Sequence, residues 1–195
     1  MSLSAEQIKK NWEIYRGLCN KLGERTENIN KMLDHFEERM VVCPASSKYH
    51  CSFCGGLIDH SLRVCSNLLK LNKTFELNLP KESMILCSLW HDGGKIGNLN
   101  EDNYIPTEED WKLRRGIRYD FNDKIPYQTY SDRGLYLLQE FGVKLSEEEY
   151  IALRISDGPY PYENKPYNMK EVPLAVYLFF ADRMACEQEK ILYGI

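Results

Sequence analysis

The sequence has no surplus of positive charge and no long apolar run. Its formal net charge is −4 at pH 7, which argues against a general nucleic-acid-binding protein. No apolar stretch is long enough to cross a membrane, and no signal-peptide core is present. Internal repeats, low-complexity tracts, domain linkers and strand-like alternation are also missing. These absences predict one helical, cytoplasmic domain without a membrane or nucleic-acid partner.

Cysteine is present, but its pattern does not indicate a disulfide framework. The chain has seven cysteines, an odd number, and no secretory features, so we interpret them as reduced thiols. Its 195 residues, with 43% hydrophobic and 28% charged content, suit one globular domain with a sizeable core. We therefore treat residues 1–195 as a single domain.

Helix signals occur along most of the chain. Ser4 begins a capping box, and residues 26–40 carry an apolar stripe at helical spacing, so residues 1–42 are expected to form scaffold helices. Further helices are expected at about 57–71, 80–90, 132–141 and 147–155, and from Pro173 onward. The predicted fold class is all-α, a helical bundle with functional side chains projecting into its core.

A His-Asp pair ends one of the apolar helices. His91 and Asp92 follow the run 84–90, and two glycines and Lys95 come directly after them. Charged groups at the edge of a core need partners or a metal ion. Glycines permit close approach of backbone or ligand, and Lys95 adds a cation one turn later. The combination favours a site for a divalent metal and a phosphate oxyanion.

A second carboxylate interrupts the last apolar helix. Residues 174–184 are apolar except for Asp182 and Arg183. Adjacent helix positions do not face each other, so an ion pair between these two neighbours does not explain the carboxylate. We interpret Asp182 as a metal ligand rather than as a partner of a nearby cation.

Together, the segments 55–64, 91–95 and 179–184 resemble the HD-domain superfamily of metal-dependent phosphohydrolases. That family has a lone histidine, a His-Asp pair and a distant aspartate on a late helix. Among its members, the chain is similar to small stand-alone HD proteins often carried by tailed phages. The resemblance spans about residues 50–190 and implies an HD-like bundle with these metal ligands: His60, His91, Asp92 and Asp182.

The resemblance implies hydrolysis of a phosphate ester, most often on a (deoxy)nucleotide mono- or triphosphate. Two imidazoles and two carboxylates suit one divalent Mn, Fe, Co, Ni or Zn ion. Such an ion would polarise a phosphoryl oxygen and activate a water for in-line attack. Lys95, together with Arg63, would neutralise the developing charge. The alternatives are a module that binds a nucleotide or a protein without turnover, and a phosphodiesterase for a cyclic or signalling nucleotide.

The chain departs from the family at two places. Some relatives hold a second metal with extra histidines, and here those places carry Tyr130 and Ser156, which leaves only Asp157. In nucleotidase relatives a glutamate follows the His-Asp aspartate by three residues, and here Lys95 stands there. We therefore expect one metal ion, with Asp157 as the candidate general base.

Residues 98–130 interrupt the helical pattern with a long aromatic and charged insertion. A short helix is expected between Thr107 and Gly116. Long insertions of this kind are commonly functional lids. We interpret this one as a lid whose rings stack on a base and whose arginines hold phosphates; the alternative is a satellite core with a solvated basic face. The candidate substrate contacts are Trp111, Arg114, Arg115, Arg118 and Tyr130.

Arg63, the Cys51–Cys54 pair and His50 have two interpretations each. Arg63 shares a helix face with His60, so it lies either near a bound substrate or in a surface ion pair. The loop at 41–56 contains Cys51-x-x-Cys54 beside His50, which is half of a zinc motif without a second half. The alternative for the cysteines is buried thiols beside the site entrance. His50 faces either the substrate or solvent.

Overall fold

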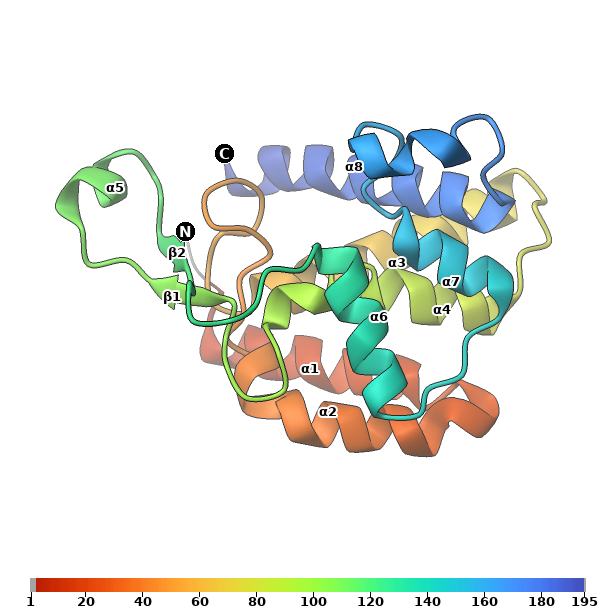
Figure 1. Ribbon diagram of the computed structural model, residues 1–195, viewed down its shortest axis with the longest axis horizontal. Helices are drawn as coiled ribbons and strands as arrows, with labels where there is room; N and C mark the ends of the chain where they lie inside the picture. Colours follow the sequence, from red (N-terminus) through yellow and green to blue (C-terminus); the bar gives the residue numbers. More distant parts are fainter. Residues whose placement is uncertain (1–2, 195) are drawn as a thin grey trace.

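The computed structural model describes residues 3–194 and is mostly helical. The longer helices are α1 (Ala5–Cys19), α2 (Thr26–Met40), α3 (Gly56–Thr74), α4 (Lys81–Trp90), α6 (Tyr130–Glu140), α7 (Glu147–Arg154) and α8 (Pro173–Tyr193). The shorter elements are η1 (Gly23–Arg25), η2 (Gly93–Ile96), η3 (Tyr162–Tyr167), α5 (Asp110–Arg114), β1 (Tyr104–Pro106) and β2 (Tyr119–Phe121). Figure 1 shows α3 and α4 in the middle, with α1 and α2 on one side and α8 on the other.

Helix ends follow the local sequence signals. The Ser4 hydroxyl accepts a hydrogen bond from the Gln7 backbone N–H at 3.1 Å, and Ser146 and Glu149 form a reciprocal capping box at the start of α7. Pro173 occupies the first turn of α8, and Gly194 ends that helix in the left-handed conformation. These observations confirm the predicted starts of α1, α7 and α8.

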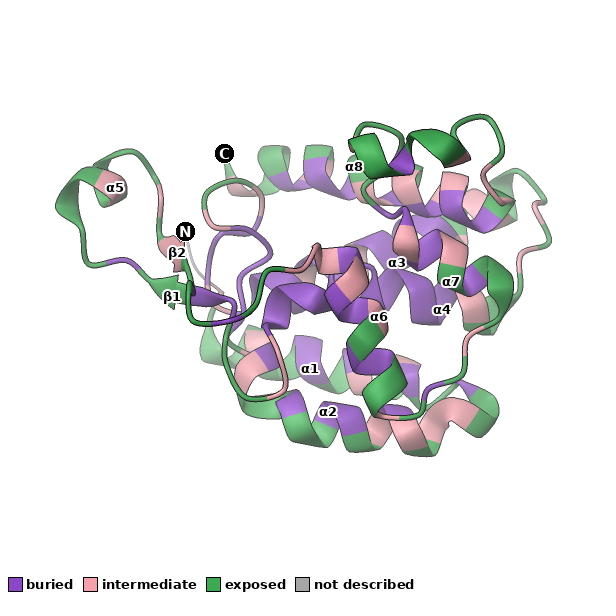
Figure 2. Ribbon diagram, in the orientation of Figure 1, coloured by how far each residue is buried: buried purple, intermediate pink, exposed green. Residues whose placement is uncertain are grey.

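One hydrophobic cluster joins the N-terminal helices to the rest of the bundle. The predicted stripe of α2 is buried and belongs to that cluster: Ile29, Met32, Leu33, Phe36 and Met40. Figure 2 shows that most of α3 and α4 is buried. The Tyr15 hydroxyl donates to the Leu89 carbonyl at 2.8 Å, and the Trp90 indole N–H donates to the Gly134 carbonyl at 2.9 Å. These two bonds fix the end of α4, where the His-Asp pair lies, against α1 and α6.

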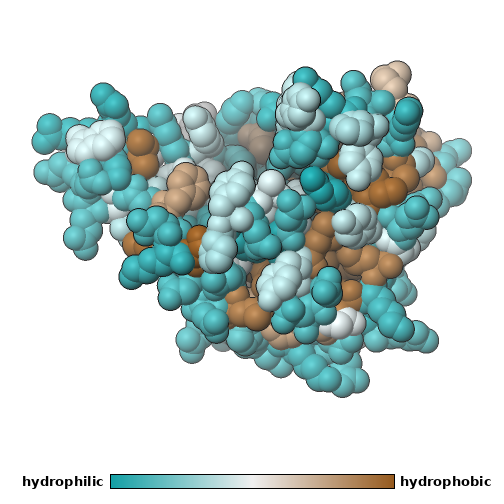
Figure 3. Space-filling view, in the orientation of Figure 1, coloured by the Kyte–Doolittle hydropathy of each residue, from teal (hydrophilic) through white to brown (hydrophobic). Residues whose placement is uncertain are grey.

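The insertion forms an arm that extends away from the bundle (Figure 1). Strands β1 and β2 pair in antiparallel fashion, with Tyr104 opposite Phe121, and α5 lies between them in the chain. These strands depart from the expectation of a purely helical chain. Each has three residues, which is too short to display the alternation that indicates a strand in a sequence. The arm surface is mostly hydrophilic on the face shown in Figure 3.

Within residues 3–194, no helix combines the length and the apolar character needed to cross a bilayer. The longest helix, α8, carries charged residues from its middle onward, including Asp182 and Glu189.

Candidate metal centre

Three helices bring the four predicted ligands together. His60 lies on α3, His91 and Asp92 directly follow α4, and Asp182 lies on α8. The Nε2 atom of His60 lies 3.0 Å from Oδ1 of Asp182 and 3.7 Å from Oδ2 of Asp92. The Nε2 atom of His91 lies 3.9 Å and 3.5 Å from the same two oxygens. The donor atoms of His60, His91 and Asp182 all lie within 4.8 Å of one another, which is the spacing that one ion can bridge.

The second ring nitrogen of each histidine is held by an acceptor. Nδ1 of His60 donates to Oε1 of Glu189 at 2.9 Å, and Nδ1 of His91 donates to the Ser88 carbonyl at 2.9 Å. A carbonyl or carboxylate oxygen can only accept a hydrogen bond, so Nδ1 of each ring carries a proton. In the neutral ring the lone pair is therefore on Nε2. Both Nε2 atoms are buried without a hydrogen-bond partner among the described residues. Buried imidazoles oriented in this way are the usual preparation of histidines for a metal ion.

The charges around His60 favour a cation. Burial opposes a positive charge there, but the carboxylates of Asp182 and Glu189 outweigh it and raise the pKa of His60 to about 10. Burial likewise opposes ionisation of Asp92, yet Lys95 and the two histidines lower its pKa to about 2. The pKa of Asp182 also lies below its ordinary value because of His60 and His91. Ionised carboxylates that draw a proton to Nε2 draw a metal cation to the same position.

Lys95 is part of the same cluster. Its Nζ donates to Oδ2 of Asp92 at 2.6 Å and lies 5.6 Å from the centre of the Tyr130 ring. Burial lowers the pKa of Lys95, but the negative charge of Asp92 exceeds that effect and raises the pKa overall. Lys95 therefore remains a cation beside the carboxylate, on the side of the site that faces α6.

The two glycines between Asp92 and Lys95 allow close packing. A Cβ atom on Gly93 would lie 2.4 Å from the Trp90 ring, and one on Gly94 would lie 2.1 Å from the Tyr130 carbonyl oxygen. Neither position has space for a side chain. The glycines therefore bring the His-Asp segment directly against α4 and α6, which places Lys95 next to Tyr130.

A cavity of roughly 730 Å³ opens beside this cluster. It shares Tyr130 and Asp157 with the site, and both the arm and α6 contribute to its walls. Asp157 keeps part of its surface in solvent, but partial desolvation of its carboxylate together with the charge of Asp92 raises its pKa. Ser156 does not face the cavity as a ligand, because its hydroxyl contacts the His91 carbonyl at 3.4 Å. The remaining lining residues are Asn103, Phe121, Asn122, Asp123, Ile125, Tyr127, Gln128, Thr129, Arg133 and Glu163.

Arg63 lies on the other side of His60, toward Nδ1. Its guanidinium donates to Oδ2 of Asp59 at 2.9 Å and approaches Oε1 of Glu189 at 3.4 Å. The Tyr193 hydroxyl donates to the same Asp59 oxygen at 2.6 Å. The structure therefore places Arg63 behind the predicted ligands, in contact with the carboxylate that orients His60.

The basic residues of the insertion lie on the exposed part of the arm. Arg114, Arg115 and Arg118 are all exposed, and Arg115 stacks over Trp111 at 5.4 Å. The backbone N–H of Arg118 donates to the Ser47 carbonyl at 3.1 Å, which ties the arm to the loop at 41–55. The structure thus does not bring the arginines and Trp111 into the cluster around His60, whereas it does bring Tyr130 there.

Sequence reasoning missed two residues that touch the site, and it left a third undecided. Glu189 is buried against His60, and the Cys186 thiol donates to Oδ1 of Asp182 at 3.6 Å. His50 was assigned either to the site or to solvent, and its ring centre lies 4.7 Å from that of His60. Burial, with the charges of Lys95 and His60, lowers the pKa of His50 to about 3, so the ring is neutral.

The Cys-x-x-Cys pair is divided between two environments. Cys51 is buried and its thiol contacts Oδ2 of Asp59 at 3.9 Å, whereas the Cys54 thiol contacts the Val41 carbonyl at 3.9 Å. Within residues 3–194, neither cysteine belongs to a group of His, Cys, Asp and Glu side chains close enough to hold an ion. The geometry agrees with the interpretation of these residues as separate thiols.

Comparison of the chain with family models, curated proteins and solved structures found no match. The chemistry of the site therefore follows from its own residues. Those residues are two oriented imidazoles, two ionised carboxylates and a buried lysine, beside a cavity with aromatic and amide walls.

Proposed function

We propose that this chain is a metal-dependent phosphohydrolase of the HD type that acts on a (deoxy)nucleotide mono- or triphosphate. The observation that carries the proposal is the pair of buried Nε2 atoms of His60 and His91, which have no hydrogen-bond partner within residues 3–194 and lie beside two carboxylates. Stability alone gives no reason to leave two such nitrogens unpaired in a core. A divalent ion bound by these groups accounts for them.

The donor set suits one transition-metal ion. His60, His91 and Asp182 supply the closest group of donor atoms, and Asp92 adds a carboxylate within 3.7 Å of both imidazoles. Mixed nitrogen and oxygen ligands favour Mn, Fe, Co, Ni or Zn over Ca or Mg. A bound ion of this kind polarises a phosphoryl oxygen and lowers the pKa of a water molecule.

The surrounding residues supply the remaining functions. Lys95 holds a positive charge at the face of Asp92 that points toward α6, where it can contact the oxygens of a phosphoryl group and stabilise their developing charge. Asp157, whose pKa is raised at the mouth of the cavity, is the group that takes up the proton of the attacking water. Arg63 positions His60 through Glu189 and contributes no direct contact to substrate.

The cavity beside the cluster fits the nucleoside part of such a substrate. Phe121, Tyr127 and Tyr130 offer aromatic rings for stacking, while Asn103, Asn122 and Gln128 offer amide donors and acceptors for a base. Its acidic residues, Asp123, Asp157 and Glu163, disfavour a phosphate tail in the same space. The phosphate would then lie at Lys95 and the metal ligands, and the base in the cavity.

The arm is proposed as a lid over this cavity. Its base already supplies Asn103, Phe121 and Asn122 to the cavity wall. Its basic cluster is exposed, so contact between those arginines and a substrate requires the arm to bend toward the bundle when substrate binds.

Phosphate release from a nucleotide panel in the presence of Mn²⁺ tests the function. The wild-type protein should release inorganic phosphate, and Asp92→Ala should lose both the release and the bound metal measured by elemental analysis. Asp34→Ala removes an exposed aspartate paired with Arg16 on the far scaffold helices and serves as the matched control. Full metal content in Asp92→Ala contradicts the site. Nucleotide binding in a thermal-shift assay without any phosphate release favours a binding module instead.

A further inference from the structure

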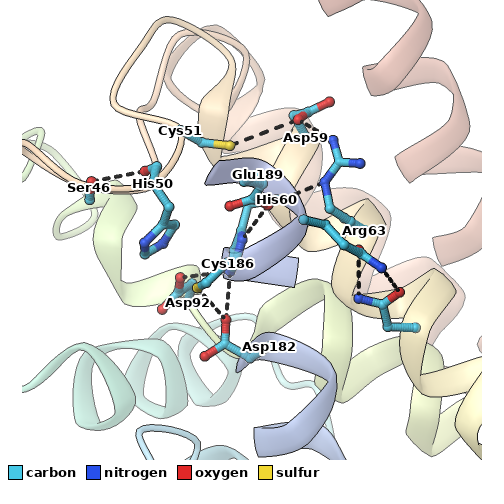
Figure 4. A network of polar contacts seen from close by, with 12 residues as sticks. Ser46, His50, Cys51, Asp59, His60, Arg63, Asp92, Asp182, Cys186 and Glu189 are labelled. Carbon is cyan, nitrogen blue, oxygen red and sulfur yellow. Dashed lines mark hydrogen bonds and ion pairs between the residues drawn. The ribbon is translucent and has the colours of Figure 1, made fainter. Parts of the chain in front are cut away.

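A second group of potential ligands lies against His60. It consists of His50, His60 and Cys186, each of which offers one donor atom, and these three atoms lie within 4.8 Å of one another. His50 comes from the loop at 41–55, His60 from α3 and Cys186 from α8, so three separate elements meet there (Figure 4). This group contains a thiol and no carboxylate, which distinguishes it from the group formed by His60, His91 and Asp182.

The loop that carries His50 is anchored in place. The Ser46 hydroxyl donates to the His50 carbonyl at 2.9 Å, and the backbone N–H of Ala45 donates to the Cys51 carbonyl at 3.1 Å. Ala45 and Cys51 are both buried in a small hydrophobic cluster of their own. The Nε2 atom of His50 is buried without a hydrogen-bond partner among the described residues. The ring of His50 is therefore held beside that of His60, with a nitrogen available to bind.

The two groups share one nitrogen lone pair. Nδ1 of His60 donates to Glu189, so only Nε2 of His60 can bind an ion. The Cys186 thiol contacts Oδ1 of Asp182, and that oxygen lies 3.0 Å from the same Nε2 atom. Because an imidazole nitrogen has a single lone pair, an ion held by His50 and Cys186 through His60 excludes an ion held by His91 and Asp182 through His60.

We propose that His50, His60 and Cys186 form a second cation position, selective for soft, thiophilic ions such as Cd²⁺, whose occupation displaces the ion from the first position. Thiolate and imidazole ligands select soft and borderline ions, whereas the carboxylate-rich first group accepts harder ions such as Mn²⁺. The identity of the metal then decides which side of His60 it occupies. This inference goes beyond the hydrolase function. The displacement rests on the proposed first metal position, but neither position requires that the chain hydrolyse a nucleotide.

A spectroscopic titration with Cd²⁺ alone tests the thiolate position. Bonds between Cd²⁺ and thiolate absorb in the near ultraviolet, so the metal-free wild-type protein should gain this absorption and saturate at one ion per chain. Cys186→Ser should lose the absorption, and His50→Ala should weaken Cd²⁺ binding about tenfold or more, as expected for removal of a ligand or its partner. His50 lies on a loop, so its substitution leaves the helical core in place if Cys186→Ser folds poorly.

Two controls separate this position from the other thiols and from the first metal site. Cys54→Ser removes the most exposed cysteine, and His91→Ala removes a ligand of the first position only; both should keep the Cd²⁺ absorption. Protein loaded with Mn²⁺ should release it, one ion for each Cd²⁺ added, as measured by the paramagnetic resonance of free Mn²⁺. Absorption that survives in Cys186→Ser overturns the thiolate ligand, and binding of both ions together overturns the exclusion.

Discussion

Glu189 accepts a hydrogen bond from Nδ1 of His60 at 2.9 Å, although 129 residues separate the two in the chain. Both side chains are fully buried. A buried carboxylate is costly unless it is paired, and here its partners are the His60 ring and the guanidinium of Arg63. The pair fixes the tautomer of His60 and turns its free lone pair toward Asp92 and Asp182.

Glu189→Gln should weaken the affinity for the metal ion. The amide keeps the shape of the side chain but loses the charge that makes His60 a stronger donor, so we expect the affinity for Mn²⁺ to fall about 10- to 100-fold. Isothermal titration with Mn²⁺ measures this directly and does not depend on knowing the substrate. Glu187→Gln is the matched control, because it makes the same change two residues away at an exposed position paired with Lys190. Equal affinities in the two variants would show that Glu189 has only a structural role.

Lys95→Ala should separate metal binding from substrate chemistry. The lysine repels a cation, so its removal should leave the metal content unchanged. Loss of the positive charge that contacts phosphoryl oxygens should lower kcat by about 100-fold or more, as for removal of a single stabilising donor. Steady-state phosphate release and elemental analysis of the same preparation give both values, with Lys73→Ala at an exposed position of α3 as the control. A variant that retains full activity would show that the Gly-Gly-Lys segment is only a turn.

The ligands of the candidate metal centre could be predicted because they contrast with their surroundings. Asp182 interrupts an apolar helix, and the His-Asp pair ends another, so helical periodicity alone makes these residues conspicuous. Helix bounds were predictable for the same reason, and α2 runs over the expected residues 26–40.

Glu189 was not predictable from local pattern. It lies in the polar stretch 187–190, which is typical of an exposed helix end, and only the packing of α8 against α3 buries it. His50 also depends on tertiary packing, since a loop has no periodicity that indicates where its side chains point. Cys186 lies on α8 and reaches the site only because that helix packs against α3. The strands of the arm were missed because three-residue strands carry no alternation.

The contact between Arg25 and Glu149 should make stability depend on pH. Arg25 donates to both carboxylate oxygens of the buried Glu149 at 2.8 Å. Burial opposes the charge on Glu149, but Arg25 and the capping N–H of Ser146 lower its pKa below the ordinary 4.5. A lowered carboxyl pKa stabilises the folded state above the unfolded-state pKa, and that contribution is lost as pH falls through the folded-state pKa.

Glu149→Gln should therefore lower the free energy of unfolding by about 2 kcal/mol at pH 7, because a charge-assisted hydrogen bond is lost. The difference from wild type should shrink as pH falls below 4.5, where the wild-type carboxylate also becomes protonated. Urea unfolding across pH 3–7 measures both effects. Glu148→Gln, its exposed neighbour in the same first turn, should show neither. A difference that is constant with pH would assign the effect to packing rather than to charge.

The basic cluster of the arm should contact phosphate through some of its arginines only. Arg114 and Arg115 end α5 and Arg118 precedes β2, so the three guanidinium groups cannot all converge on one phosphate, and at most two should contribute. If the arm closes over the cavity, alanine at a contributing position removes a bidentate contact to a phosphate oxygen. The loss should raise the barrier for kcat/KM by about 2 kcal/mol.

Measuring kcat/KM for each single alanine variant on the best nucleotide decides the question. Arg16→Ala, on the scaffold helix α1 where it pairs with Asp34, is the control for loss of a partly exposed arginine. The effect of a true contact should also depend on the number of phosphates in the substrate. With a monophosphate in place of a triphosphate, substitution of the arginine that reaches the outer phosphates should reduce kcat/KM less. The effect of Lys95→Ala should be the same on both substrates. If all three variants match the parent on both substrates, the basic cluster is a solvated surface, and the arm contributes to the site only through the base that lines the cavity.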